Sequence, residues 1–233
     1  MLLVQNVYKQ FGGIHALEDV NIELERGKIW SVIGPNGAGK TTLFNLITGT
    51  LPADSGKIKF LGDDITYLKP FNICRKGIAR TYQQKNLFAN LSVFDNIGAG
   101  LLKDRIGRDE RAKSVLELIE FLELSGMKDE VVGSLAPLYC KLVELGRALA
   151  TSPKLILLDE LIGGLLPAET KKICDIIQAL KGEGYTILQI GHEIGPIMKT
   201  SDWIFVLDEG HKIAEGVPED IRNNKDVHDV YLE

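Results

Sequence analysis

The chain has 233 residues, of which 45% are apolar and 7% aromatic, and its formal net charge is −5 at pH 7. This length allows one large domain, or one domain with an inserted lobe, and enough apolar residues to bury a sizeable core. The mildly acidic balance argues against a nucleic-acid-binding surface, which is usually basic, so we expect no nucleic acid among the partners.

The cysteines and the hydropathy pattern bear on the compartment. Cys74, Cys140 and Cys174 form no CxxC pair and are odd in number, which favours reduced thiols in the cytoplasm. The start MLLVQNVYKQF has no cationic segment followed by a long apolar run, so we expect no signal peptide. No stretch approaches the ~18 uncharged apolar residues of a spanning helix. Any action at a membrane must therefore go through a partner.

The first half of the chain predicts strands followed by a helical region. The first ~25 residues and Lys57 to Phe60 are typical of short antiparallel strands beside a core. Ile29 to Ile33 (IWSVI) is a buried-strand candidate that ends directly in GPNGAGKTT. The middle, residues 87–149, lacks strand signals, and we expect it to be helical throughout. Its apolar stripe at helical spacing consists of Val115, Leu118, Ile119 and Leu122.

Three apolar runs in the second half each end in polar or glycine residues. They are Leu155 to Leu158 (LILL), Thr186 to Ile190 (TILQI), and Trp203 to Leu207 (WIFVL), which runs into the hairpin-like turn DEGHK. Such short runs suit central parallel strands that are buried on both faces. Between the first two runs, an amphipathic helix is indicated by Ile173, Ile176, Ile177 and Leu180.

This alternation of strands and helices predicts an α/β fold with a mostly parallel sheet. We expect residues 1–86 and 150–233 to form the core together with a small antiparallel β subdomain. Residues 87–149 are then an inserted helical subdomain. Because ligands of open α/β sheets bind at the carboxyl ends of strands, the polar clusters that follow these strands are the candidate site.

The glycine-rich segment after the first core strand fits the phosphate-binding motif G-x-x-x-x-G-K-[ST] at every fixed position. It also has the required context, with a strand before it and a helix after it. Backbone N–H groups there face an anion, Lys40 reaches the β- and γ-phosphates, and Thr41 holds Mg²⁺. The chain is thus predicted to have a P-loop NTPase core. The candidate nucleotide-binding residues of this segment are Gly34, Asn36, Gly37, Ala38, Gly39, Lys40, Thr41 and Thr42.

Acidic residues and a histidine follow the next two core strands. Asp159 is placed to bind Mg²⁺ through water, and Glu160 to orient and deprotonate the attacking water. Alone, this acidic pair reads equally well as a solvated turn, but the P-loop favours the catalytic interpretation. His192 would, in isolation, more often be a packing or surface residue. At the end of a strand beside the P-loop, we expect it near the γ-phosphate.

Gln83, in ARTYQQKNLF, lies where the core gives way to the helical region. A glutamine at this position can touch Mg²⁺ or water and sense the nucleotide. We therefore count Gln83 among both the catalytic and the metal-binding candidates. Because Gln84 is its neighbour, the choice between these two glutamines stays open.

These motifs resemble, over the whole chain, those of the nucleotide-binding subunits of ABC transporters. GPNGAGKTT, the glutamine of RTYQQ, LILLDE and the histidine of IGHE occur in the family's order and spacing. Phe11, before two glycines, matches the family's adenine-stacking aromatic residue. FGGIHAL, KLVELGRAL and the ending IAEGVPEDIRNNKDVHDVYLE further resemble the branched-chain amino acid importer ATPases. The lipopolysaccharide-export ATPase is a close relative with a similar tail.

The resemblance implies a mechanism and partners. Two such subunits dimerise head to tail around two ATP molecules, each ATP touching the P-loop of one subunit and the LSGGQ turn of the other. Closure and hydrolysis drive two integral membrane permease subunits, whose coupling helices dock on the helical subdomain and the Gln83 region. The expected cofactors are ATP and Mg²⁺, and the expected location is peripheral, on the inner face of the cell membrane.

The turn that corresponds to LSGGQ departs from this pattern. Its positions, aligned on KLVELGRAL, are Leu135, Ala136, Pro137, Leu138 and Tyr139, and only the first agrees. Ala136 has no hydroxyl for the γ-phosphate, Pro137 has no N–H, and Leu138 replaces a glycine that lets the backbone approach phosphate. Lost hydrogen bonds to a charged group cost roughly 1.5–3 kcal/mol each. We expect the site completed by this turn, which belongs to the partner subunit, to be nearly silent.

Two further apolar departures belong to the family's dimer interface. Leu161 replaces the proline that usually follows Asp-Glu, and Leu166 stands where the family often has Asn or Asp. Three explanations of the altered turn compete. It is the naturally degenerate turn of one subunit in an asymmetric dimer, or an altered or engineered sequence, or the helix starts at a shifted position so that the alignment misleads. We hypothesise that the chain binds MgATP alone, hydrolyses it poorly as a homodimer and gains activity in a heterodimer.

Three functions compete on these residues. The intact Glu160 and His192 favour an ATP-driven transport motor, whereas the altered turn favours a catalytically weak nucleotide-binding switch subunit. An ABC ATPase acting on DNA or ribosomes needs coiled-coil inserts, a second nucleotide domain or basic patches. This acidic chain shows none of these features.

Overall fold

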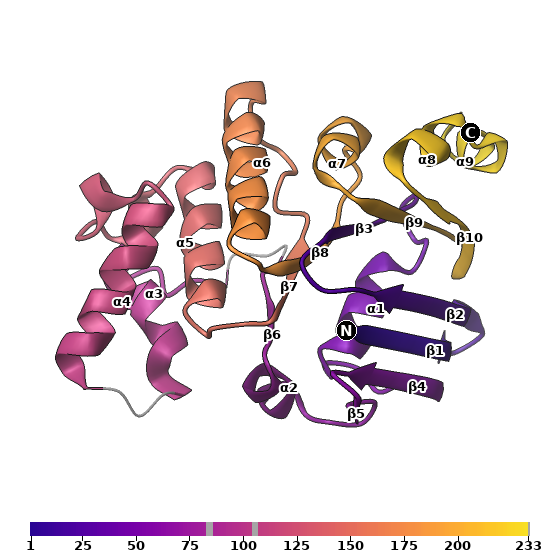
Figure 1. Cartoon of the computed structure of the whole chain (residues 1–233), viewed down its shortest axis with the longest axis horizontal. Helices are drawn as coiled ribbons and strands as arrows, with labels where there is room; N and C mark the ends of the chain where they lie inside the picture. Colours follow the sequence, from indigo (N-terminus) through magenta and orange to yellow (C-terminus); the bar gives the residue numbers. More distant parts are fainter. Residues whose placement is uncertain (83–85, 104–106, 233) are drawn as a thin grey trace.

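The computed structural model describes residues 1–82, 86–103 and 107–232. Two sheets and the helices around them make up this part of the chain (Figure 1). The larger sheet has the strand order β10-β9-β3-β8-β7-β6 and the smaller one the order β2-β1-β4-β5. The predicted α/β class with one mostly parallel sheet and one antiparallel β region is confirmed.

The larger sheet carries the core. Neighbouring strands from β9 to β6 pair in parallel, and only β10 pairs antiparallel, with β9. Every residue of β3, β7 and β8 is buried, as expected for strands covered on both faces. The bounds are β3 Ile29–Ile33, β6 Ile78–Arg80, β7 Leu155–Asp159, β8 Thr186–Ile190, β9 Trp203–Asp208 and β10 His211–Gly216.

The smaller sheet is antiparallel, as predicted from the first ~25 residues, but its first two strands are long rather than short. β1 spans Leu2–Phe11 and β2 spans Ile14–Leu24, and register shifts interrupt their pairing. These irregularities increase the local twist, which lets long strands wrap over the core. β4 (Ser55–Phe60) and the short β5 (Asp63–Asp64) complete the sheet.

The helices cover the larger sheet and extend beyond its β6 edge (Figure 1). The amphipathic stripe predicted after residue 170 is buried as expected, since Ile173, Ile177 and Leu180 are at most 1% exposed. The bounds are α1 Lys40–Ile47, α2 Pro70–Lys76, α3 Val93–Gly98, α4 Arg108–Phe121, α5 Pro137–Leu149, α6 Pro167–Gly182, α7 Ile194–Thr200, α8 Pro218–Asn223 and α9 Lys225–Leu232.

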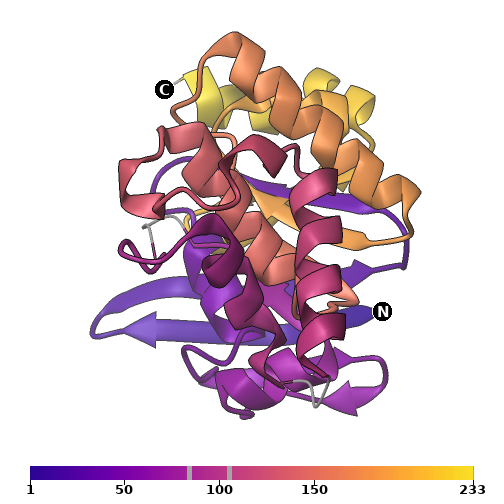
Figure 2. The ribbon, with the colours of Figure 1, turned by 90° about the vertical axis from the view of Figure 1, so that its left-hand side faces the viewer.

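The middle of the chain is not helical throughout, contrary to the prediction. Between α4 and α5 the backbone forms turns and two short 3₁₀ helices, Ser125–Met127 and Val132–Ser134, and Ser92 forms an isolated β-bridge with Val131. A third 3₁₀ helix, Ala99–Lys103, follows α3. Figure 2 views the molecule from the side of α3, α4 and α5. We retain residues 87–149 as a proposed subdomain.

Strand register brings the predicted site together. Asp159, the last residue of β7, pairs with Ile190 of β8, and Ile190 pairs with Val32 of β3. The three loops that follow these parallel strands therefore leave the sheet at the same edge.

Candidate nucleotide-binding site

The loop between β3 and α1 has a backbone path that requires glycine at two positions. Gly34 has a φ of +153°, and a Cβ there would lie 2.1 Å from the carbonyl oxygen of Leu207. Gly39 has a φ of +98°, and its Cβ would lie 2.4 Å from the carbonyl oxygen of Ala16 in β2. The loop is thus clamped between β9 and β2, and its N–H groups at the start of α1 are held for an anion.

The side chain of Lys40 is buried beneath this loop and bonds to its backbone. Its side chain is 7% exposed, and its Nζ donates to the carbonyl oxygens of Gly34 at 2.8 Å and Pro35 at 2.7 Å. Burial lowers the pKa of the ammonium below its ordinary value, and the nearby Glu160 carboxylate opposes this shift. The remaining predicted residues of the loop lie around it: Asn36, Gly37 and Thr41 are exposed, Thr42 is half-buried and Ala38 is buried.

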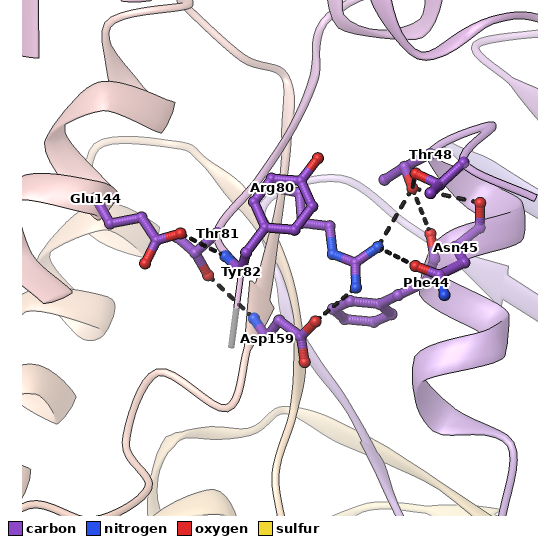
Figure 3. Close-up of polar contacts among 9 residues, drawn as sticks. Phe44, Asn45, Thr48, Arg80, Thr81, Tyr82, Glu144 and Asp159 are labelled. Carbon is purple, nitrogen blue, oxygen red and sulfur yellow. Dashed lines mark hydrogen bonds and ion pairs between the residues drawn. The ribbon is translucent and has the colours of Figure 1, made fainter. Parts of the chain in front are cut away.

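Asp159 lies at the buried end of β7 and is 4% exposed. Its backbone N–H donates to the hydroxyl of Thr81, at 3.1 Å. Its Oδ2 lies 2.5 Å from Nη2 of Arg80, which is also buried (Figure 3). The predicted metal-binding carboxylate therefore has a fixed orientation and an internal counter-ion.

Glu160 and His192 lie side by side at the ends of β7 and β8. His192 Nδ1 is 3.7 Å from Glu160 Oε1, and the two side chains are 53% and 20% exposed. Glu160 has a φ of +49°, a conformation that costs free energy in a residue other than glycine. Its N–H donates to Ile190 of β8 at 3.0 Å, and Lys141 of α5 donates to its carbonyl oxygen at 3.1 Å. These bonds hold the strained residue with its carboxylate beside the histidine.

Phe11 ends β1 and faces solvent. Its side chain is 45% exposed, and the Lys9 ammonium lies 5.3 Å from the ring centroid. The hairpin that carries it continues into β2, whose Ala16 contacts the P-loop at Gly39. An exposed ring in this position is available for stacking on a base.

Gln83 and Gln84 lie outside the described residues, so the role assigned to Gln83 stays a prediction. The residue before them is fixed by α5, because the backbone N–H of Tyr82 donates to Glu144 Oε1 at 2.7 Å. Burial raises the pKa of the Glu144 carboxyl above its ordinary value.

The altered turn opens α5 without a side-chain cap. Ala136 holds the N-cap position, makes no side-chain hydrogen bond, and is exposed, as is Pro137 at the first helical position. Leu138 is different, since its side chain is 6% exposed and belongs to the apolar core with Leu142 and Leu145. Leu138 therefore replaces the family's glycine with a side chain that points into the core of its own chain.

The two other apolar departures also differ from each other. Leu161 is 4% exposed and lies in the core of its own chain, whereas Leu166 is 69% exposed. Lys141 donates to the carbonyl oxygen of Leu161 at 2.8 Å, so α5 fixes this loop. Of the two, only Leu166 has an exposed apolar side chain.

The available donors fit Mg²⁺ better than a metal held by protein alone. Among the described residues, no three His, Cys, Asp or Glu side chains are grouped to bind a metal. The hydroxyl of Thr41, in the first turn of α1, and the carboxylate of Asp159, at the end of β7, are hard oxygen donors. Mg²⁺ is usually bound by one or two such groups, with phosphates and water completing the shell.

Sequence reasoning missed three polar residues of this site: Arg80, Lys141 and Glu144. Arg80 ends a strand of three residues, too short to give a recognisable pattern. Lys141 and Glu144 lie on α5, within the region predicted to be helical, but no sequence pattern predicted their polar contacts. For Lys141 and Glu144, the available signal was that each charged residue stands inside an apolar segment.

Comparison with known proteins agrees with this geometry. Residues 17–163 match the ABC transporter family, and residues 211–232 match the branched-chain amino acid ATP-binding cassette transporter family. A probable branched-chain amino acid transport ATP-binding protein LivG of Archaeoglobus fulgidus is 37% identical, over 100% of this chain and 95% of its own. The lipopolysaccharide export system ATP-binding protein LptB of Escherichia coli is 35% identical, over 99% and 96%.

Solved structures give the same result. A nucleotide-free ATP-binding cassette from an ABC transporter matches with a TM-score of 0.91 and 34% identity, over 100% of this chain and 99% of the other. A cassette solved as a dimer in a post-hydrolysis state, bound to ADP and Pi, matches with a TM-score of 0.84 and 26% identity, over 94% and 99%. Within the described part of this chain, no helix is both long and apolar enough to cross a membrane. The chain belongs to the ABC transporter family and is one of its ATP-binding, ATPase subunits.

Proposed function

We propose that this ATP-binding subunit powers the import of branched-chain amino acids through integral membrane permease subunits. The observation that carries this assignment is the match of residues 211–232 to the branched-chain family, in addition to the likeness over the whole chain. The alternative is lipopolysaccharide export, which the 35% identity to LptB supports. The protein then lies at the cytoplasmic face of the membrane, where its permeases recruit it.

In the proposed reaction, the P-loop amides and Lys40 bind the polyphosphate, and Phe11 stacks on the adenine. Thr41 and Asp159 would hold Mg²⁺, with Gln83 as the third predicted contact, and the ion would supply positive charge to neutralise the phosphates of the nucleotide. Glu160 accepts a proton from water as the water oxygen bonds to the γ-phosphorus and the bond to the ADP oxygen breaks. His192, 3.7 Å from Glu160, lies where it can contact the γ-phosphate.

We further propose that the partner is a second ATP-binding subunit with an intact signature turn. The P-loop, Asp159 and Glu160 of this chain retain their geometry, whereas its own turn, at Ala136 and Pro137, lacks a hydroxyl and an N–H. A homodimer would then bind MgATP and hydrolyse it slowly. In that state the protein acts as a weak nucleotide-binding switch, and in a heterodimer as a motor.

Two experiments test the proposal. Nucleotide binding is measured with a fluorescent ATP analogue, and Lys40→Ala should weaken it by more than about a hundredfold, since an ammonium and its phosphate contacts are lost. Substrate class is tested by reconstituting the chain with its cognate permeases and a binding protein in vesicles and measuring uptake of labelled leucine. Extraction of lipopolysaccharide without leucine uptake would favour the export alternative.

A further inference from the structure

Arg80 connects the two halves of the proposed magnesium site. It is the last residue of β6, and its guanidinium is 5% exposed. One arm, Nη2, lies 2.5 Å from Asp159 Oδ2, and the other, Nη1, donates to Asn45 Oδ1 of α1 at 2.6 Å. Figure 3 shows the guanidinium lying between the carboxylate and α1. One rigid group thus links the end of β7 to the helix that begins at the P-loop.

The surroundings of the guanidinium leave it little freedom. Its central carbon lies 5.6 Å from the ring centroid of Phe44 and 5.0 Å from that of Tyr82. Nη1 also approaches the hydroxyl of Thr48 at 3.4 Å. Two flanking rings and acceptors on both arms fix the plane of the fork, which a lysine ammonium cannot reproduce. Nε is buried without a hydrogen-bond partner among the described residues, so the two terminal arms carry the polar contacts.

A cation this close to a carboxylate competes with any metal for the same charge. The Asp159 side chain is nearly inaccessible to water, so screening of the pair is weak. Within the described residues, Oδ2 of Asp159 is engaged by Nη2 of Arg80. The positive charge beside Oδ2 fixes the orientation of the carboxylate and lowers its attraction for a second cation.

We propose that Arg80 is a positioning residue that orients Asp159 and weakens its affinity for the metal of the bound nucleotide. The inference rests on the proposed function, because it takes Mg²⁺ with a nucleotide as the ligand. Through Asn45, the same guanidinium connects the carboxylate to α1, so nucleotide binding at the P-loop and metal binding at Asp159 are energetically linked. Such a coupling is reciprocal and can be measured from either ligand.

The test is the effect of Mg²⁺ on ADP affinity, which requires no turnover. The dissociation constant of a fluorescent ADP is measured with saturating Mg²⁺ and with EDTA. The dissociation constant in EDTA divided by that in Mg²⁺ measures the coupling between nucleotide and metal. Arg80→Gln keeps a hydrogen-bond donor but removes the charge, and should raise this ratio by about tenfold. Arg80→Lys keeps the charge and should leave the ratio within about threefold of wild type while lowering the melting temperature.

A second pair of variants keeps Arg80 in place if Arg80→Gln does not fold. Asn45→Asp offers the guanidinium another carboxylate, so Asp159 must share its counter-ion, and the ratio should rise about threefold. Ser55→Asp adds the same charge at an exposed position outside this network and should change the ratio by less than half of that. An unchanged or lower ratio in folded Arg80→Gln, or equal effects of the two aspartates, overturns the inference. Wild-type ADP binding that ignores Mg²⁺ contradicts the proposed function instead.

Discussion

The P-loop edge of the sheet and the opening of α5 differ in how their sequences are constrained. At the P-loop edge, backbone contacts leave no room for a Cβ at Gly34 and Gly39, and Lys40 and Asp159 are buried. At the start of α5, Ala136 and Pro137 are exposed and make no side-chain hydrogen bond. The P-loop edge is constrained by the chain's own fold and by its proposed nucleotide binding. The start of α5 is free to change because, in the proposed dimer, only the partner's site depends on it.

The largest expected effect concerns the carboxylate beside His192. Glu160→Gln removes the proposed general base but keeps the size of the side chain, so the ATPase rate of an active dimer should fall by about 10²–10⁴. Nucleotide affinity should stay within a few-fold, because the P-loop is untouched. Single-turnover hydrolysis and fluorescent-nucleotide binding measure the two quantities. A variant that keeps wild-type turnover would remove Glu160 from the proposed chemistry.

Restoring the polar groups of the turn should have the next largest effect. Ala136→Ser with Pro137→Gly supplies a hydroxyl and an N–H without disturbing the buried Leu138. Steady-state ATPase of the homodimer should rise at least about tenfold, since a single donor of this kind is often worth more. Ala136→Gly with Pro137→Ala is the matched control, because it restores the N–H alone and should give a smaller gain. No gain from the first variant would show that the turn does not limit hydrolysis.

The inward orientation of Leu138 predicts a cost in stability rather than in activity. Leu138→Ala leaves a cavity in the core and should lower the free energy of unfolding by about 2–4 kcal/mol, measured with urea. Leu166→Ala removes the same atoms from a side chain that is 69% exposed and should cost less than about 0.5 kcal/mol. Equal costs would contradict the different burial of the two leucines.

The smallest expected effect is a pH dependence from Glu144. Because burial raises the pKa of this carboxyl, the folded state binds more protons than the unfolded state between the ordinary and the raised value. Stability should therefore fall as pH rises through that window. Glu144→Gln keeps an acceptor for Tyr82 and carries no charge, so it should flatten this part of the profile. Glu117→Gln, on the exposed face of α4, should leave the profile unchanged; a flat wild-type profile would contradict the assignment.

Sequence predicted best what depends on local pattern. The strands IWSVI, LILL and TILQI were recognisable because they are buried on both faces, and the P-loop because its glycines have fixed spacing. The juxtaposition of Glu160 and His192 followed from the rule that parallel strands end at one edge.

What the sequence could not supply depends on contacts between distant segments. Arg80 meets Asp159 across 79 positions and Asn45 across 35, and no spacing rule links such residues. Residues 87–149 were expected to be helical because they lack strand signals, and this absence does not distinguish an α-helix from the 3₁₀ turns before α5. The inward orientation of Leu138 depends on its packing in the core, which comparison with the family's glycine does not reveal.

The central claim is that this chain's P-loop site is intact and lacks only a competent turn from its partner. A direct test mixes the wild-type chain with a chain that carries Ala136→Ser, Pro137→Gly and Glu160→Gln. The mixed dimer then has one site with an intact P-loop, Glu160 and a restored turn, while each chain alone is nearly inactive. We predict an ATPase rate for the mixture at least about tenfold above either chain alone. A mixture no more active than its components would contradict the claim.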